Sequence, residues 1–69
     1  MYAEREEGRY AAIDDDEKAY TVVVTSRVSP EGVVIVKNYR LSDGRQLNRV
    51  GDGEFMIVGE GVTLYSKAP

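Results

Sequence analysis

The stretch SPEGVVIVKNYRLSDGRQLNRVGDGEFMIVGEGV, residues 29–62, has an acidic residue directly before a glycine at four places. These dipeptides are Glu31-Gly32, Asp43-Gly44, Asp52-Gly53 and Glu60-Gly61. Their glycines lie twelve, nine and eight residues apart, with β-branched and aromatic residues in the segments between them. Glycine accepts the positive φ that tight hairpins need, and turn signals at this spacing are typical of consecutive antiparallel strands. The stretch therefore predicts an all-β fold.

The strand plan extends outward from these turns to both ends of the chain. We expect strands at residues 20–28, 33–41, 45–50, 54–58 and 62–66. Residues 9–13 are expected to add a sixth strand; a short helix beginning within residues 3–7 is the alternative, although Gly8 would interrupt it. The predicted fold class is all-β, a small antiparallel meander of five to six short strands that forms a curled sheet or an SH3-like or OB-like barrel. Residues 1–7 are predicted to be a flexible acidic N-terminal tail, and residues 8–67 a single β domain.

Two of the turns set an expected register. Ser29-Pro30-Glu31-Gly32 predicts a type I turn that closes with glycine in the left-handed region, and Asp43-Gly44 predicts a two-residue loop. The resulting opposite pairs are Val28 with Val34, Val24 with Asn38, Val22 with Arg40, and Arg40 with Leu47. In this register neither face of the first long hairpin is cleanly apolar, although a bulge would exchange the faces partway along a strand.

Two segments are apolar on both sides of their strand, namely Val22-Val23-Val24 and Val33–Val36. A sheet with one wet face should alternate between apolar and polar residues, so these segments require cover on both faces. A curled sheet covers one face, and the second cover comes from the N-terminal segment or from another subunit. This pattern predicts a homodimer, and the residues of the candidate dimer or core surface are Val23, Ile35, Tyr39 and Leu41.

The composition argues against a catalytic or metal-binding protein. The chain has 69 residues with no cysteine and no histidine, so it offers no disulfide, no Cys/His zinc site and no histidine to activate a nucleophile. Asp43 and Asp52 occupy turn positions where aspartate is expected for conformational reasons. The acidic run Asp14–Glu17 is contiguous and lacks the alternating ligands and central glycine of a calcium loop. We predict no enzyme activity, no cofactor and no metal.

Charge and hydropathy bear on location and partners. Residues 1–20 carry seven acidic and three basic side chains, whereas residues 21–69 carry five acidic and six basic ones. The N-terminus is charged with no apolar stretch behind it, and no apolar run approaches the roughly twenty residues of a membrane span. We therefore expect a cytoplasmic protein without a membrane partner.

Three functional hypotheses follow from these observations. The first is a small non-catalytic protein–protein interaction module, homodimeric, with a protein partner that the sequence does not identify. The second is a nucleic-acid-binding small β-barrel that uses Asn38, Arg40, Arg45 and Arg49. Small barrels bind single strands with a basic groove and stacking aromatics, but here Tyr39 falls on the other face and the net charge is −3. The third is an acidic inhibitor of a nucleic-acid-binding partner, in which the Asp14–Glu17 run mimics phosphates or lies over Arg40 and Arg49.

Overall fold

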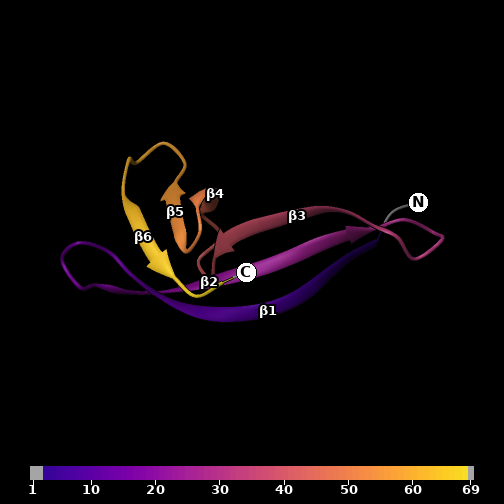
Figure 1. Cartoon of the computed structure of the whole chain (residues 1–69), viewed down its shortest axis with the longest axis horizontal. Coiled ribbons are helices and arrows are strands. Elements are labelled where there is room, and N and C mark those ends of the chain that lie inside the picture. The colour runs from indigo at the N-terminus through magenta and orange to yellow at the C-terminus, as the bar shows by residue number, and fades with distance from the viewer. Residues whose placement is uncertain (1–2, 69) are drawn as a thin grey trace.

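The computed structural model of the chain describes residues 3–68, apart from the side chain of Ile35. The strands are β1 (Ala3–Ile13), β2 (Ala19–Val28), β3 (Val34–Leu41), β4 (Gln46–Gly51), β5 (Glu54–Ile57) and β6 (Thr63–Ser66). Each strand pairs antiparallel with the next, and β6 returns to β1, so the meander closes into a ring (Figure 1). The predicted all-β antiparallel meander is confirmed, with six strands.

The ring is uneven, because two of its strand pairings involve only two residues of each strand. β6 pairs with β1 only at Ala12 and Ile13, and β4 pairs with β3 only at Tyr39 and Arg40. The rest of the three long strands projects from the ring, which gives the molecule extents of 43 × 22 × 21 Å (Figure 1). We call this projection the arm; it consists of residues 3–9 of β1, 25–28 of β2 and 34–38 of β3, with the turn between β2 and β3.

The first turn of the arm forms as the sequence predicts. The amide of Gly32 donates to the carbonyl of Ser29 at 2.9 Å, and Gly32 has a φ of 85°. Pro30 sets the φ of the second turn position, and glycine takes the left-handed conformation that closes it. The tip of the arm is therefore a tight turn.

The predicted two-residue loop at Asp43-Gly44 is wrong. The amide of Leu41 donates to the carbonyl of Arg45 at 2.8 Å, so residues 42–44 form a three-residue loop. The carboxylate of Asp43 accepts the Arg45 amide at 3.0 Å, and Gly44 has a φ of 98°. A type I turn followed by a left-handed glycine produces this loop length.

A β-bulge in β3 changes the register that the turn sets. Val28 lies opposite Val34, as predicted, but Arg27 lies opposite Val36, so that Ile35 is an extra residue. Beyond the bulge the expected pairs are wrong by one residue, since β2 now faces the next residue along β3. The observed pairs there are Val24 with Tyr39 and Val22 with Leu41. Between β3 and β4, the three-residue loop shifts the pairing by one residue, so that Tyr39 lies opposite Leu47.

The shifted register gives the ring a cleanly apolar interior. Its buried residues are Ala12, Val22, Val24, Leu41, Leu47, Phe55, Ile57, Leu64 and Ala68. The mixed faces expected from the sequence resulted from the wrong register, because the bulge moves Asn38 and Arg40 to the side of the sheet away from this core. We call the core side of β1–β3 the inner face and the opposite side the outer face.

Strand β1 begins earlier than expected. Residues 3–7 fall in the predicted flexible tail, but Ala3–Glu6 pair with β2 from Val28 to Thr25; residues 1 and 2 lie outside the described part. The alternative helix is not formed. A register shift between Glu6 and Gly8 leaves Glu7 as an extra residue, and a Cβ on Gly8 would lie 3.0 Å from the Tyr10 ring. The glycine therefore lets the tyrosine ring lie against the strand.

Candidate functional site

The two doubly apolar segments have different environments in the structure. In the first, Val22, Val23 and Val24 are each no more than 1% exposed. Val22 and Val24 belong to the ring core, whereas Val23 faces outward between Arg9 and Arg40. The chain itself therefore covers both faces of this segment.

The outer cover of β2 consists of ion-paired side chains from the two neighbouring strands. Arg40 contacts Glu4 at 3.2 Å and Arg9 contacts Glu6 at 3.1 Å. The methylene stems of such arginines cover apolar surface while their guanidinium groups remain in water. Thr25 is only 2% exposed in the same row, and its hydroxyl has no hydrogen-bond partner among the described residues.

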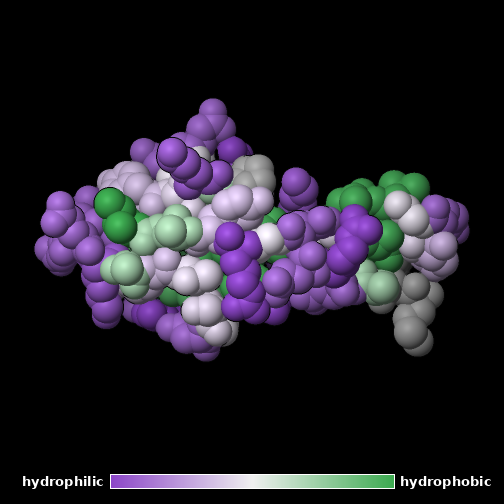
Figure 2. Space-filling view, turned by 90° about the horizontal axis from the view of Figure 1, so that it is seen from below, coloured by the Kyte–Doolittle hydropathy of each residue, from purple (hydrophilic) through white to green (hydrophobic). Residues whose placement is uncertain are grey.

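The second doubly apolar segment is exposed. Val33 is 61% exposed, Val34 is 45% exposed and Val36 is 43% exposed. Figure 2 shows hydrophobic residues gathered at the far end of the arm, separated from the ring by hydrophilic ones. Val34 lies opposite Val28 and Val36 opposite Arg27, so the two side chains point to opposite faces of the arm, on either side of the β3 strand. Apolar side chains that stay this exposed at the end of a projection indicate an interaction site.

The same segment of β3 also has an unpaired backbone edge. Because β4 meets β3 only at Tyr39 and Arg40, no strand within residues 3–68 pairs with the far side of Val34–Asn38. An exposed strand edge presents unsatisfied N–H and C=O groups that can pair with another chain. We define the arm surface as Val33, Val34 and Val36 together with this edge.

The opposite edge of the arm, along β1, is of a different kind. It carries Glu4, Arg5, Glu6, Glu7 and Arg9, and it is interrupted by the bulge at Glu7. Charged side chains and bulges are the features by which proteins keep an edge strand from pairing. The β3 edge also contains a bulge, at Ile35, but Lys37 is its one charged residue between Val34 and Asn38. Its low charge and its exposed valines make it the edge better suited to contact another chain.

Most charged side chains of the β1 edge are engaged within the chain. Arg5 and Glu7 pair at 3.1 Å, and hydrogen bonds from Ser26 and then Arg5 lower the pKa of the Glu7 carboxyl. Arg9 similarly lowers the pKa of Glu6 through a side-chain hydrogen bond. Within residues 3–68, three charged residues around the arm surface form no ion pair, and these are Arg27, Glu31 and Lys37. The charge of Lys37 nevertheless helps to lower the pKa of Glu7.

A small hollow lies where β3 and β4 diverge, next to the arm surface. Its volume is about 290 Å³, and Lys37 and Arg49 are among its lining residues. The other lining residues are Asn38, Tyr39, Gln46, Leu47 and Asn48. We call this hollow the wedge.

The structure does not bring the four residues predicted for nucleic-acid binding together. Asn38 and Arg40 lie on the outer face of β3, and Arg40 pairs with Glu4. Arg49 lies opposite Phe55 on β5 and contacts Asp52 at 2.7 Å. Arg45 lies in the loops at the other end of the ring. Each of the three arginines thus already contacts a carboxylate.

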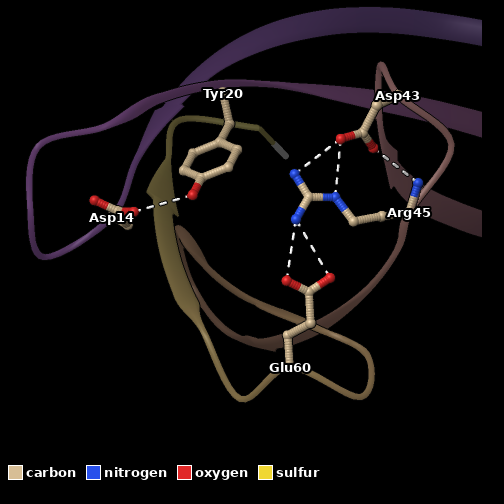
Figure 3. Close-up of polar contacts among 5 residues, drawn as sticks. All are labelled: Asp14, Tyr20, Asp43, Arg45 and Glu60. Atoms are coloured by element: carbon tan, nitrogen blue, oxygen red, sulfur yellow. Dashed lines mark hydrogen bonds and ion pairs between the residues drawn. The ribbon is translucent and has the colours of Figure 1, made fainter.

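Arg45 joins three loops at that end of the ring (Figure 3). Its guanidinium contacts Asp43 at 2.8 Å and Glu60 at 3.1 Å, and it lies 5.9 Å from the centre of the Tyr20 ring. The Tyr20 hydroxyl in turn donates to Asp14 at 3.0 Å. The cluster therefore connects the β1–β2, β3–β4 and β5–β6 loops, and its polar groups are engaged with one another.

The acid–base properties of this cluster fit a structural role. The side-chain hydrogen bond from Arg45 is the main cause that lowers the pKa of Asp43. The backbone amide of Lys18 is the main cause that lowers the pKa of Asp14, and burial followed by the Asp14 hydrogen bond raises the pKa of Tyr20. Low carboxyl pKa values do not suit a general acid or base at neutral pH.

The acidic run does not lie over Arg40 and Arg49. Asp14 accepts the amides of Asp16 and Lys18, both at 2.9 Å, and so stabilises its own turn. The carboxylate that reaches Arg40 is Glu4, which was assigned to the tail. The expected acidic cover thus exists in part, but a different segment supplies it.

The candidate dimer or core residues also separate. Val23 and Leu41 are 1% and 2% exposed, and Tyr39 is half-buried against Phe55 with ring centroids 5.0 Å apart. The side chain of Ile35 lies outside the described part. The sequence-based candidate surface does not include Val34 and Val36, which the structure exposes; the signal for them is the unbroken aliphatic run Val33–Val36.

A larger groove, of about 520 Å³, lies at the seam between β1 and β6. It is lined by Tyr10, Ala11, Ala12, Ile13, Gly53, Tyr65, Ser66 and Lys67. Its lining is mostly apolar and contains no cluster of polar groups that would orient a small molecule. The groove alone does not identify a ligand.

Comparison with known proteins gives no relative: no family model, curated protein or solved structure matches the chain. Within residues 3–68, no three residues of the types Asp, Glu, His and Cys are grouped as a metal ion would require. The same residues contain no helix long and apolar enough to cross a membrane. Inference about function therefore depends on the arm surface and its surroundings.

Proposed function

We propose that the chain is a non-catalytic protein–protein interaction module that forms a homodimer through the arm surface. The observation that supports this most is the coincidence of exposed valines and an unpaired strand edge on the same five residues of β3, Val34–Asn38. Backbone hydrogen bonds to the edge would supply affinity, and burial of the valine side chains would add about 25 cal/mol for each Å² removed from water.

A second copy is the simplest partner for this surface. A two-fold axis brings the same patch from both molecules together, and β3 paired with β3 leaves no further edge of that kind exposed. The small core supports the same conclusion, since a domain of this size gains stability from association. The argument for a dimer no longer involves Val22–Val24, which the chain covers by itself.

A non-catalytic role agrees with the chemistry of the side chains. The chain has no histidine or cysteine, and Asp14, Asp43 and Glu60 are engaged in the loop cluster. The lack of cysteine also fits the reducing cytoplasm, which we propose as its location.

Nucleic-acid binding receives less support from the geometry. Phosphates would have to displace Glu4 from Arg40, the carboxylates of Asp43 and Glu60 from Arg45, and Asp52 from Arg49, at separate places on the surface. An acidic inhibitor is also less well supported, because Asp14 in the acidic run is occupied by turn amides and Tyr20.

Sedimentation equilibrium of the purified chain tests the proposal. The wild type is expected to self-associate at micromolar concentration, and Val36→Lys is expected to be monomeric. Val58→Lys is the matched control, because Val58 is 52% exposed but lies outside the arm. A monomeric wild type at high micromolar concentration, or equal loss of association in both variants, would contradict the proposal.

A further inference from the structure

We infer that two copies pair antiparallel along β3 about a two-fold axis near Val34–Val36, and that Glu31 of each copy forms an ion pair with Lys37 of the other. This inference rests on the proposed function, for which it specifies the geometry and the charged contacts. Three features lead to it: the open edge, the unpaired charges and the wedge.

The open edge limits how the strands can align. It extends from Val34 to Asn38, because β4 occupies the edge from Tyr39 onward. In an antiparallel pair, residues before the centre of one strand lie beside residues after the centre of the other. A pairing centred between Val34 and Val36 uses the beginning of the open segment and ends before β4, and it places the bulge at Ile35 at its centre.

This alignment brings opposite charges together. Lys37 lies just after the centre, so it comes beside Val33 of the second copy, and Glu31 lies two residues further along. Glu31 lies in the turn, and even fully extended chain spans only about 7 Å over two residues, a distance that extended lysine and glutamate side chains bridge. In a single copy the two residues are six positions apart along the chain and form no ion pair with each other.

The wedge provides room for the turn of the second copy. That turn, residues 29–32, leads away from the paired segment toward the divergence of β3 and β4. Lys37 and Arg49 line the wedge, so Glu31 of the second copy would approach two cations. Arg49 already contacts Asp52, which makes Lys37 the principal partner.

Charge reversal tests this contact directly. In a homodimer of Glu31→Lys, each of the two inferred contacts places one lysine against another. In a homodimer of Lys37→Glu, each contact places one glutamate against another. Each variant alone is expected to self-associate on the order of tenfold more weakly than the wild type, since like charges replace attractive pairs at two places. In an equimolar mixture, both contacts of the mixed dimer are attractive, and association is expected to recover.

Controls separate this contact from general charge effects. Asp16→Lys and Lys67→Glu make the same charge changes at exposed residues outside the arm, and each is expected to self-associate like the wild type. Circular dichroism and amide NMR spectra verify that all variants are folded. Self-association is measured by sedimentation equilibrium, for each variant and for the mixture.

The possible results distinguish the two proposals. Recovery in the mixture, with weak association of each variant alone, supports the inferred pairing. If the wild type self-associates and both reversals associate equally well, the pairing is wrong, whereas the arm can still be the contact surface. If the wild type stays monomeric, both the proposed function and this inference are overturned.

Discussion

The ring of Tyr39 packs against the ring of Phe55, with centroids 5.0 Å apart and planes inclined by 52°. Tyr39 comes from β3 at the point where the arm leaves the ring, and Phe55 comes from β5 at the centre of the core. Tilted aromatic pairs at this separation are favourable beyond their buried area. The contact therefore anchors the base of the arm to the ring.

Phe55→Ala should unfold the domain or leave it marginally stable. Phe55 is 0% exposed, and removing a buried phenylalanine costs about 3–5 kcal/mol, which is comparable to the whole stability of a small domain. Urea unfolding followed by circular dichroism measures this. Met56→Ala is the control, because Met56 is 37% exposed and its loss should cost about 1 kcal/mol or less. A Phe55→Ala variant as stable as the control would show that the core is not organised around this ring.

Gly53→Ala should be more destabilising than Gly44→Ala. Both glycines have positive φ, at 72° and 98°, so both variants bear a cost of about 1 kcal/mol for an alanine there. Only at Gly53 would the new Cβ also lie 2.9 Å from a backbone atom, the carbonyl oxygen of Ser66. The additional strain should appear as a lower melting temperature for Gly53→Ala, and equal melting temperatures would contradict the close approach of this turn to β6.

Acid should weaken the loop cluster through Asp43. The pKa of Asp43 is lower in the folded state than its ordinary value of about 4, so the unfolded state binds the proton first as the pH falls. The stability that this carboxylate contributes is present above about pH 4 and is lost as the pH falls through the folded pKa.

Arg45→Gln removes the main cause of that pKa shift. The variant should be less stable than the wild type at pH 7, and the difference should shrink in strongly acidic buffer. Thermal unfolding across a pH series measures the difference, with Arg45→Lys as a control that keeps the charge but loses the two-sided hydrogen bonding. A difference that does not change with pH would contradict the role of Asp43.

Much of the fold was predictable because glycine turns have a local cause. Gly32, Gly44, Gly53 and Gly61 all adopt positive φ, and the strands between them lie within about two residues of their expected limits. The bulge at Ile35 was not predictable, because it depends on which faces can be buried in the closed ring. That single extra residue altered every β2–β3 pair beyond it, which is why Arg40 and Leu41 exchanged their expected sides.

The candidate site was predictable only in part. The aliphatic run at Val33–Val36 signalled a need for cover, but the equal signal at Val22–Val24 is satisfied within the chain by Arg9 and Arg40. Cover by charged side chains depends on which strands are neighbours, which the sequence does not state. The open edge similarly depends on where β4 diverges from β3.

Hydrogen exchange of the β3 backbone amides tests the central claim most directly. In a monomer, amides of Val34–Asn38 that point away from β2 are exposed to water and should exchange rapidly. If β3 pairs with β3, the exchange of these amides should slow as the protein concentration rises. The amides of Glu4–Arg9 that point away from β2, on the opposite edge of the arm, should keep the same rate. Exchange in Val34–Asn38 that stays independent of concentration, under conditions where sedimentation shows a dimer, would contradict association through the arm.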